Sequence, residues 1–272
     1  MLGFVSMFMD MSSEIIHSLL PVFMVSVLGA STLTVGIIEG IAEGTASIVK
    51  IFSGVLSDWT RRRKPLLLLG YGLAAATRPL FCVATSAWVV LLARFTDRIG
   101  KGLRGAPRDA MVADLTPHHQ RGAAYGLRQA LDTAGSILGP ACALALMVTT
   151  HNDFQLSFIV AMIPSIIVMV ILVFGVKEPP RDFMPQDKLL TLKRAHLVKL
   201  SPAFWFVTVL AGVLTLARFS DAFLVLKAND VGLGATGAPV ILMIMNIMYA
   251  AIVYPAGRLQ DILGEYEILA LS

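Results

Sequence analysis

Three titratable side chains share one face of the first apolar segment of the chain. Asp10, Glu14 and His17 follow at i, i+4 and i+7, a spacing that places them on the same side of a helix. Burial favours the neutral form of a carboxyl group, and imidazole exchanges its proton near neutral pH. Such a face can take up and release protons. It can also ligate a divalent transition metal if Glu39 and Glu43 of the next segment converge on it.

A second set of charges forms a basic stripe farther along the chain. Its members follow at helical steps of three and four and are Arg94, Arg98, Lys101, Arg104 and Arg108. Asp97 lies beside the stripe and can pair with Lys101 at i+4 or with Arg94 at i+3. Arg104 and Arg108 are expected to reach a membrane interface. For Arg94 with Asp97, a static packing role and a substrate role both remain open.

The composition shows which solvent surrounds these charges. The chain has 272 residues, of which 56% are hydrophobic and 15% are charged, whereas about a quarter of the residues in soluble domains are charged. Runs without Asp, Glu, Lys or Arg cover residues 154–176, 200–217 and 231–257, each near or above the roughly 18 to 20 residues that span a bilayer. The sequence therefore predicts a multi-pass membrane protein.

The elements that must position the charges are membrane-spanning helices. Lipid leaves helices or closed barrels as the ways to satisfy a backbone, and these runs are too long for barrel strands. The predicted fold is all-α, with about eight spans: 3–29, 32–57, 65–85, 87–110, 122–148, 154–176, 203–227 and 237–258.

Buried charges in such spans need partners or a water-filled cavity. We expect Asp10 and Glu14 to pair with Arg94 or Arg98. Glu39 and Glu43 either extend the acidic face or meet Lys50, and the sequence leaves this undecided. The charged groups interpreted as packing groups are Arg78, Arg128 and Asp132.

The distribution of Lys and Arg predicts the orientation of the chain. The connection after the second span, "DWTRRRKP", contains four basic residues, and the one after the sixth, residues 177–202, contains six. Because basic loops stay on the cytoplasmic side, both termini are predicted to be cytoplasmic in a plasma (inner) membrane. These loops account for the net charge of +4, so it gives no support to nucleic-acid binding.

One motif recurs within the chain. "GVLSD" at residues 54–58 and "GRLQD" at 257–261 both end even-numbered spans on the cytoplasmic side. Two related halves in the same orientation are the parallel repeat of a large class of transporters. "GKGLRG" at 100–105 matches a dinucleotide pattern, but it ends a membrane helix instead of following a strand, so a nucleotide site is not predicted.

Three motifs at consistent positions make the chain resemble the major facilitator superfamily. The loop motif between helices 2 and 3 is matched by Gly54, Asp58, Arg63 and Lys64. The helix 4 motif is matched by Arg94, Gly100 and Gly102. The helix 5 motif, associated in the family with antiporters, is matched by Gly126, Gly135, Gly139 and Pro140.

The resemblance implies a central cavity lined by helices 1, 4 and 7 of this chain. The seventh span would contribute Arg218 and Asp221 of "ARFSD", an echo of "ARFTD" at 93–97. The family has twelve helices, so the chain is expected to be a form truncated after the eighth. Residues 1–176 would form a six-helix bundle, 177–202 a cytoplasmic linker and 203–272 a partial second bundle of two helices.

The predicted function is secondary transport: proton-coupled export of a small organic solute by alternating access, without a cofactor. In the expected cycle, protonation of Glu14 or Asp10 weakens its pairing with Arg94 or Arg98, while Asp58 and its basic neighbours latch the cytoplasmic side. The alternatives are a membrane protein that does not transport, either a relic or an assembly subunit, and a divalent metal exporter. An enzyme is not predicted, because no nucleophile, base and orienting group come together on a readable face.

Overall fold

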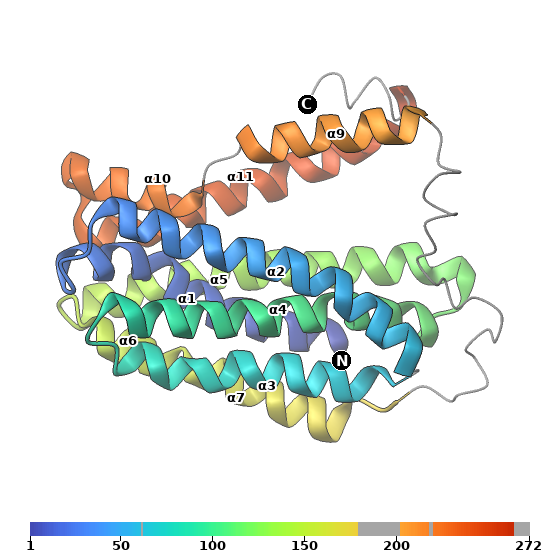
Figure 1. Cartoon of the computed structure of the whole chain (residues 1–272), viewed down its shortest axis with the longest axis horizontal. Coiled ribbons are helices and arrows are strands. Elements are labelled where there is room, and N and C mark those ends of the chain that lie inside the picture. Colours follow the sequence, from blue (N-terminus) through green and yellow to red (C-terminus); the bar gives the residue numbers. More distant parts are fainter. Residues whose placement is uncertain (61, 179–201, 218–219, 264–272) are drawn as a thin grey trace.

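The computed structural model is a bundle of long helices (Figure 1) and describes residues 1–60, 62–178, 202–217 and 220–263. No strand occurs within these ranges. The helices are α1 (Leu2–Ser26), α2 (Thr32–Thr60), α3 (Arg63–Cys82), α4 (Ala87–Leu115), η1 (His118–Gln120), α5 (Arg121–Thr149), α6 (Phe154–Val160), α7 (Met162–Val170), η2 (Ile171–Gly175), α9 (Pro202–Ala217), α10 (Asp221–Ala228), η4 (Asn229–Leu233) and α11 (Gly234–Leu263).

The predicted spans correspond to these helices within a few residues, but two of the spans are not single continuous helices. The sixth span is divided into α6, α7 and η2, with a break at Ala161 just before Pro164. The seventh is divided into α9 and α10, and the residues between them, 218–219, lie outside the described part. A tight turn then leads into α11, where Gly232 and Gly234 adopt φ of 93° and 62°, a region that glycine enters without steric cost.

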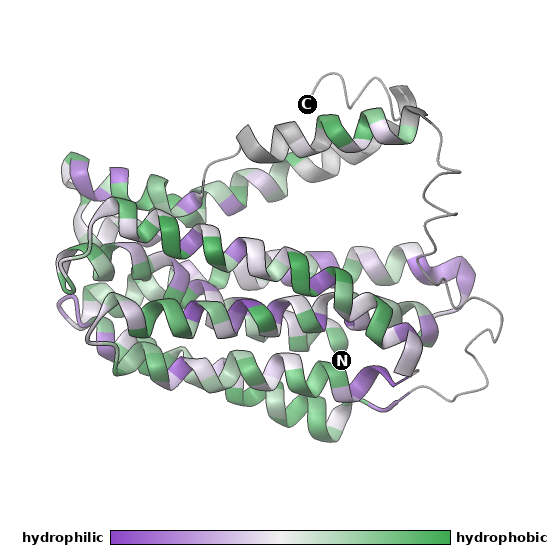
Figure 2. Cartoon of the chain, viewed as in Figure 1, coloured by the Kyte–Doolittle hydropathy of each residue, from purple (hydrophilic) through white to green (hydrophobic). Residues whose placement is uncertain are grey.

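Five stretches of the described chain are long and apolar enough to cross a membrane: Leu2–Ser26, Arg63–Cys82, His118–Thr149, Phe154–Gly175 and Asp221–Ile252. The last of them contains the turn between α10 and α11. The helices α2 and α4 are as long as their neighbours, but both carry several charged residues. Figure 2 shows hydrophobic residues along α3 and α7 and hydrophilic ones interspersed along α4. The chain is a multi-pass, all-α membrane protein, as predicted.

The helix α1 lies in the centre of the bundle. One of its faces packs against α5 so closely that a Cβ atom on Gly139 would lie 2.5 Å from the Cβ of Glu14. Its later half packs against an aromatic core, in which the rings of Phe23 and Phe158 meet edge to face with centroids 5.3 Å apart. Because neighbours surround α1, its polar face points into the protein and away from lipid.

We call the end of the bundle where α3 begins, at Arg63, the basic end, and the opposite end, at the turns of Gly29 and Gly232, the turn end. In Figure 1 the chain begins near the basic end. The division into bundle, linker and partial second bundle stays a prediction, and most of the linker lies outside the described residues. The cytoplasmic placement of the basic end also stays a prediction.

Candidate functional site

A polar cavity of about 630 Å³ lies between the first six helices of the chain and its last part. Residues from α1, α2, α4, α10 and α11 line it. They are Glu14, His17, Gly36, Glu39, Gly40, Glu43, Ser47, Arg98, Lys101, Ser220, Asp221, Phe223, Leu242, Met245 and Asn246. The cavity therefore brings together one charged face from each of α1, α2 and α4 and an acidic residue of α10.

His17 stands at the centre of the acidic residues. Its Nδ1 lies 3.7 Å from a carboxylate oxygen of Glu14, one turn earlier on α1. Its Nε2 lies 3.7 Å from a carboxylate oxygen of Glu39 on α2. A protonated imidazole at this position attracts both carboxylates, whereas a neutral imidazole has one donor and one acceptor nitrogen and cannot donate to both. The protonation of His17 therefore determines how strongly α1 and α2 are joined here.

The basic stripe of α4 finds its partners on α2. Arg94 forms a buried ion pair with Glu39, and both side chains are almost fully buried. One turn toward the basic end, Arg98 lies 3.2 Å from Glu43. The expected pairing of these arginines with Asp10 or Glu14 is wrong, as is the alternative that Glu39 and Glu43 meet Lys50. The two glutamates that the sequence left undecided are the partners of the stripe.

Close packing explains this register. A Cβ atom on Gly102 of α4 would lie 2.8 Å from the backbone oxygen of Ala46 on α2, and one on Gly100 would contact the backbone of Gly70 on α3. Small residues allow helix backbones to approach this closely. The glycines of "GKGLRG" therefore serve helix packing, and the approach at Gly102 sets the basic stripe against the acidic face of α2.

Asp97 points away from the cavity. Its carboxylate lies 3.3 Å from Arg78 of α3, and Arg78 also donates a hydrogen bond of 2.8 Å to Ser13 of α1. Both partners of the ion pair are buried. The expected pairing of Asp97 with Lys101 or Arg94 is wrong, because Asp97 lies on the side of α4 that packs on α3. Arg78 holds three helices together, which agrees with its interpretation as a packing group.

Asp10 is separated from Glu14 and His17. It does not line the cavity and makes no hydrogen bond or ion pair with the described residues, and the basic groups that act on it are Lys101, Arg104 and Arg108 of α4. The nearest parts of α4 turn inward: Arg104 is buried with its guanidinium 4.8 Å from the centre of the Tyr71 ring. Arg108 donates to the Ser6 hydroxyl and lies 3.6 Å from Asp132. The expectation that Arg104 and Arg108 reach the interface is therefore wrong.

A pair of opposite charges on α5, Arg128 and Asp132, lies near Arg108 of α4. Arg128 donates to Asp132 one turn later at 2.5 Å and lies 3.7 Å from Asp109 of α4. These contacts tie α5 to α4. The interpretation of Arg128 and Asp132 as packing groups fits this geometry.

Two unpaired charges line the cavity. Lys101 is exposed to it and makes no ion pair or hydrogen bond with any described residue. Asp221, in the first turn of α10, is half-buried and likewise unpaired within the described part of the chain. Arg218, its predicted companion, lies outside the described residues.

The loop motif at the basic end is a network of charges around Arg63. Its guanidinium lies 3.4 Å from Asp58 and donates to Asp114 of α4 at 2.6 Å. Glu178 accepts hydrogen bonds from the backbone N–H groups of Arg63 and Lys64, at 2.6 and 2.8 Å. A carboxylate here satisfies free donors at the start of α3. Asp114 and Glu178 were not predicted, since sequence spacing does not relate them to the motif.

Two other positions of the loop motif have local roles. Gly54 packs against Ala106 of α4, where an added Cβ would lie 3.6 Å from the Cβ of that alanine. Lys64 donates to the backbone oxygen of Val173 at 2.9 Å, near the end of η2. The second copy of the motif, at 257–261, falls on side chains outside the described part.

The antiporter-like motif of α5 lies mainly against α1. A Cβ atom on Gly135 would collide with the backbone oxygen of Met7, and one on Gly139 would collide with Glu14. Pro140 is buried. Gly126 has open space around it. Two of the four positions, Gly135 and Gly139, thus position the helix that carries Glu14 and His17.

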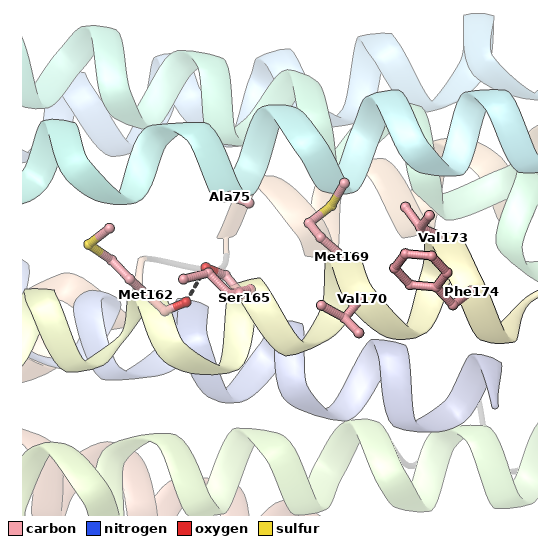
Figure 3. A pocket seen from close by; sticks show the side chains of 8 residues that line it. Ala75, Met162, Ser165, Met169, Val170, Val173 and Phe174 are labelled. Atoms are coloured by element: carbon pink, nitrogen blue, oxygen red, sulfur yellow. Dashed lines mark hydrogen bonds between the residues drawn. The ribbon is translucent and has the colours of Figure 1, made fainter.

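A second, apolar hollow of about 270 Å³ lies between α3 and α7. Figure 3 shows Ala75, Met169, Val173 and Phe174 around it, with the Ser165 hydroxyl turned to the backbone oxygen of Met162 at 2.7 Å. No charged group lines this hollow. It has neither the donors nor the acceptors that would orient a polar solute.

The described residues contain no group of three or more His, Cys, Asp or Glu side chains arranged to hold a metal ion. No metal centre is therefore assigned to the cavity.

Relatives of the chain support a transporter. A protein of Methanocaldococcus jannaschii described as an uncharacterized MFS-type transporter is 31% identical over the whole of this chain, which spans 68% of that protein. The multidrug resistance protein MdtH of Yersinia pestis is 31% identical over 46% of this chain and 31% of its own length. Such proteins move solutes and are not enzymes.

Solved transporters share the fold. An inward-facing, occupied bacterial homologue of the human lysosomal transporter Spinster superposes with a TM-score of 0.77 at 17% identity, over 96% of this chain and 60% of that one. A peptide transporter of the POT family in complex with alafosfalin gives 0.61 at 17% identity, over 93% and 50% of the two chains. The profile of the Major Facilitator Superfamily matches residues 2–272. By its helices, its cavity and these relatives, the chain belongs to the major facilitator superfamily.

Proposed function

We propose that this chain exchanges a small organic solute for protons and that the exchange is coupled at the Glu14, His17 and Glu39 cluster. The observation that carries the proposal is the position of His17, whose two ring nitrogens face carboxylates on two different helices at 3.7 Å each. Intramembrane titratable groups of this kind mark proton and substrate pathways.

The cluster contains one carboxylate in a buried ion pair, Glu39, and one that lines the cavity, Glu14. Glu39 is fixed by its buried ion pair with Arg94. Glu14 is 24% exposed and lines the cavity, so protons and solute can both reach it. When His17 and Glu14 share an added proton, the attraction between α1 and α2 changes, and the cavity wall can exchange partners with the solute.

The network around Arg63 supplies the latch in this cycle. At the basic end, the ends of α2, α3 and α4 are joined by Asp58, Arg63 and Asp114. We place this end on the cytoplasmic side of a plasma membrane. All three helices belong to the first part of the chain, so in this cycle the network holds their ends together while the two halves rock around a central site.

Export as the direction is supported by two features. The helix 5 motif that accompanies antiport in the family is present, and Gly135, Gly139 and Pro140 of this motif pack against α1 or are buried. A relative over 46% of this chain is described as a multidrug resistance protein. Adding the solute to one side of the membrane at a time measures the direction of transport.

The test is solute-dependent proton movement in vesicles. The purified full chain is reconstituted with a pH-sensitive dye inside, and a pool of organic amines, carboxylates and zwitterions is added on either side. We expect the pool to drive proton movement in wild type and Glu14→Gln to abolish it. Glu43→Gln is the matched control, because Glu43 lines the same cavity but faces Arg98 instead of His17.

Two results would contradict the proposal. Wild type that moves no protons with any solute would favour the alternative of a membrane protein that does not transport. A Glu14→Gln variant with unchanged proton movement would remove the cluster from the coupling step.

A further inference from the structure

We infer that the cavity binds a zwitterionic solute with an apolar body, whose anionic group contacts Lys101 and whose cationic group contacts Asp221. The inference rests on the proposed transport function and names the class of solute. It depends on the pattern of charges that the protein leaves unpaired.

Most charges at the cavity are already paired inside the protein. Arg98 lies 3.2 Å from Glu43, Arg94 forms its ion pair with Glu39, and Glu14 faces His17. Lys101 and Asp221 remain without a partner among the described residues although both line the cavity. One charge of each sign is thus left for a ligand.

Neither charged side chain makes a hydrogen bond or an ion pair with a described residue. Asp221 sits in the first turn of α10, where the helix dipole favours a carboxylate. However, the cap of that helix is the hydroxyl of Ser220, which accepts from the N–H of Ala222, so the carboxylate itself is free to accept. The charges around Lys101 include those of Arg98, which repels it, and of Glu43 and Asp10, which attract it without forming an ion pair. An anion in the cavity can therefore make the direct contact that these carboxylates do not make.

The two charges come from opposite halves of the molecule. Lys101 is on α4 and Asp221 is in the first turn of α10. Transporters commonly place substrate sites at the interface between their two related halves. A solute with both charges can therefore join the two halves, which is the differential contact that a rocking cycle requires.

The remaining wall suits an apolar body. Phe223, Leu242 and Met245 line the cavity beside the charged groups. Its volume of about 630 Å³ falls within the roughly 300 to 1,000 Å³ of small-molecule sites. A purely anionic solute would leave Asp221 unpaired, and a purely cationic one would leave Lys101 unpaired, each at a cost inside a membrane.

The experiment compares probes that share one apolar body. Phenylalanine, leucine and their dipeptides are the zwitterions; phenethylamine and 3-phenylpropionate are the matched cation and anion. Thermal unfolding of the full chain in detergent is followed with each probe at millimolar concentration. We expect the zwitterions to raise the midpoint and to bind about tenfold more tightly than either single-charge analogue.

Two variants test which protein side chain contacts each charged group of the solute. Lys101→Gln should remove the preference for a zwitterion over the amine, and Asp221→Asn should remove the preference over the carboxylate. Lys50→Gln and Asp230→Asn are the matched controls, since neither residue lines the cavity, and both should keep the wild-type preferences.

The outcomes separate this inference from the proposed function. If the mixed pool drives proton movement but no zwitterion stabilises the protein more than the amine or carboxylate does, the solute class is wrong and the transport function stands. If zwitterions bind with the expected dependence on Lys101 and Asp221 but no solute moves protons, the binding inference stands and the coupling proposal fails.

Discussion

At the residue scale, the cavity wall is built from charge pairs that cross between helices. Arg94 and Glu39 are the most buried of them, with exposed fractions of 4% and 3%. Arg98 and Glu43 form a looser pair, in which Glu43 is 55% exposed. A buried pair contributes little net stability, but the loss of one partner leaves a charge that nothing compensates.

This difference predicts the effect of removing each glutamate. Glu39→Gln should lower the free energy of unfolding by about 3 to 5 kcal/mol, because it strands Arg94. Glu43→Gln, the control, should lower it by less than Glu39→Gln does, because water reaches that carboxylate although Arg98 is buried. Denaturant unfolding in detergent measures both changes.

A double variant tests whether the unpaired charge of Arg94 causes this loss of stability. Glu39→Leu combined with Arg94→Met should recover most of the lost stability, since two apolar groups replace the pair. It should still fail to move protons in vesicles. A Glu39→Gln variant as stable as wild type would mean that Arg94 has another partner.

At the element scale, the sequence predicts where each helix begins and ends better than how the helix is rotated about its axis. The uncharged runs and the basic loops locate the spans within a few residues, because membrane insertion depends on local composition. Most of the ion pairs of α4 differ from those that the sequence predicts, because they depend on which side of α4 faces α2 and which side faces α3. Gly102 and Gly100 decide this through backbone approaches that spacing alone does not reveal.

The face of α1 shows the same limit. Periodicity places Asp10, Glu14 and His17 on one side, and the structure brings Glu14 and His17 into the cavity. Asp10 lies more than one turn closer to the basic end, where Arg104 and Arg108 of α4 are already turned inward. A shared helix face is therefore not a shared site once neighbouring helices close over part of it.

The contact of α5 with α1 gives a prediction about an element. Gly139→Ala places a Cβ 2.5 Å from the Cβ of Glu14 and 2.9 Å from the backbone oxygen of Met11, so α1 must shift. We expect a loss of thermal stability and weaker proton coupling. Gly126→Ala, with open space at its Cβ, should leave coupling unchanged and gain up to about 1 kcal/mol from helix propensity.

Coupling and thermal stability are measured in parallel on both variants. If Gly139→Ala behaves like Gly126→Ala in the vesicle assay, the position of Glu14 does not depend on the close approach of α5.

At the scale of the whole molecule, the two parts of the chain meet along α5 and around α10. Asn246 of α11 donates to the backbone oxygen of Ser136 at 2.8 Å, and Thr236 donates to Asn152 at 3.0 Å near the turn end. The Phe223 ring of α10 reaches α2, where a Cβ on Gly36 would lie 2.9 Å from the tip of the ring. These contacts join the last part of the chain to the first six helices beside the cavity.

The fit of Phe223 over Gly36 predicts how closure limits transport. Gly36→Leu should slow solute-dependent proton movement, because the added side chain keeps α10 from approaching α2. Phe223→Ala on its own removes apolar wall and should weaken solute binding. Combined with Gly36→Leu, it should restore movement relative to the single Gly36→Leu variant, because the space vacated by the ring accommodates leucine.

The comparison is a double-mutant cycle on initial rates in vesicles, with equal protein incorporation verified for each variant. Gly40→Leu is the matched control: it lies one turn farther along α2, lines the same cavity and has nothing within 4 Å of its Cβ position. Independent effects of Gly36→Leu and Phe223→Ala would show that the two residues do not meet during the cycle. Coupled effects, absent with Gly40→Leu, would place the closing contact at Phe223, on the same short helix whose first turn carries Asp221.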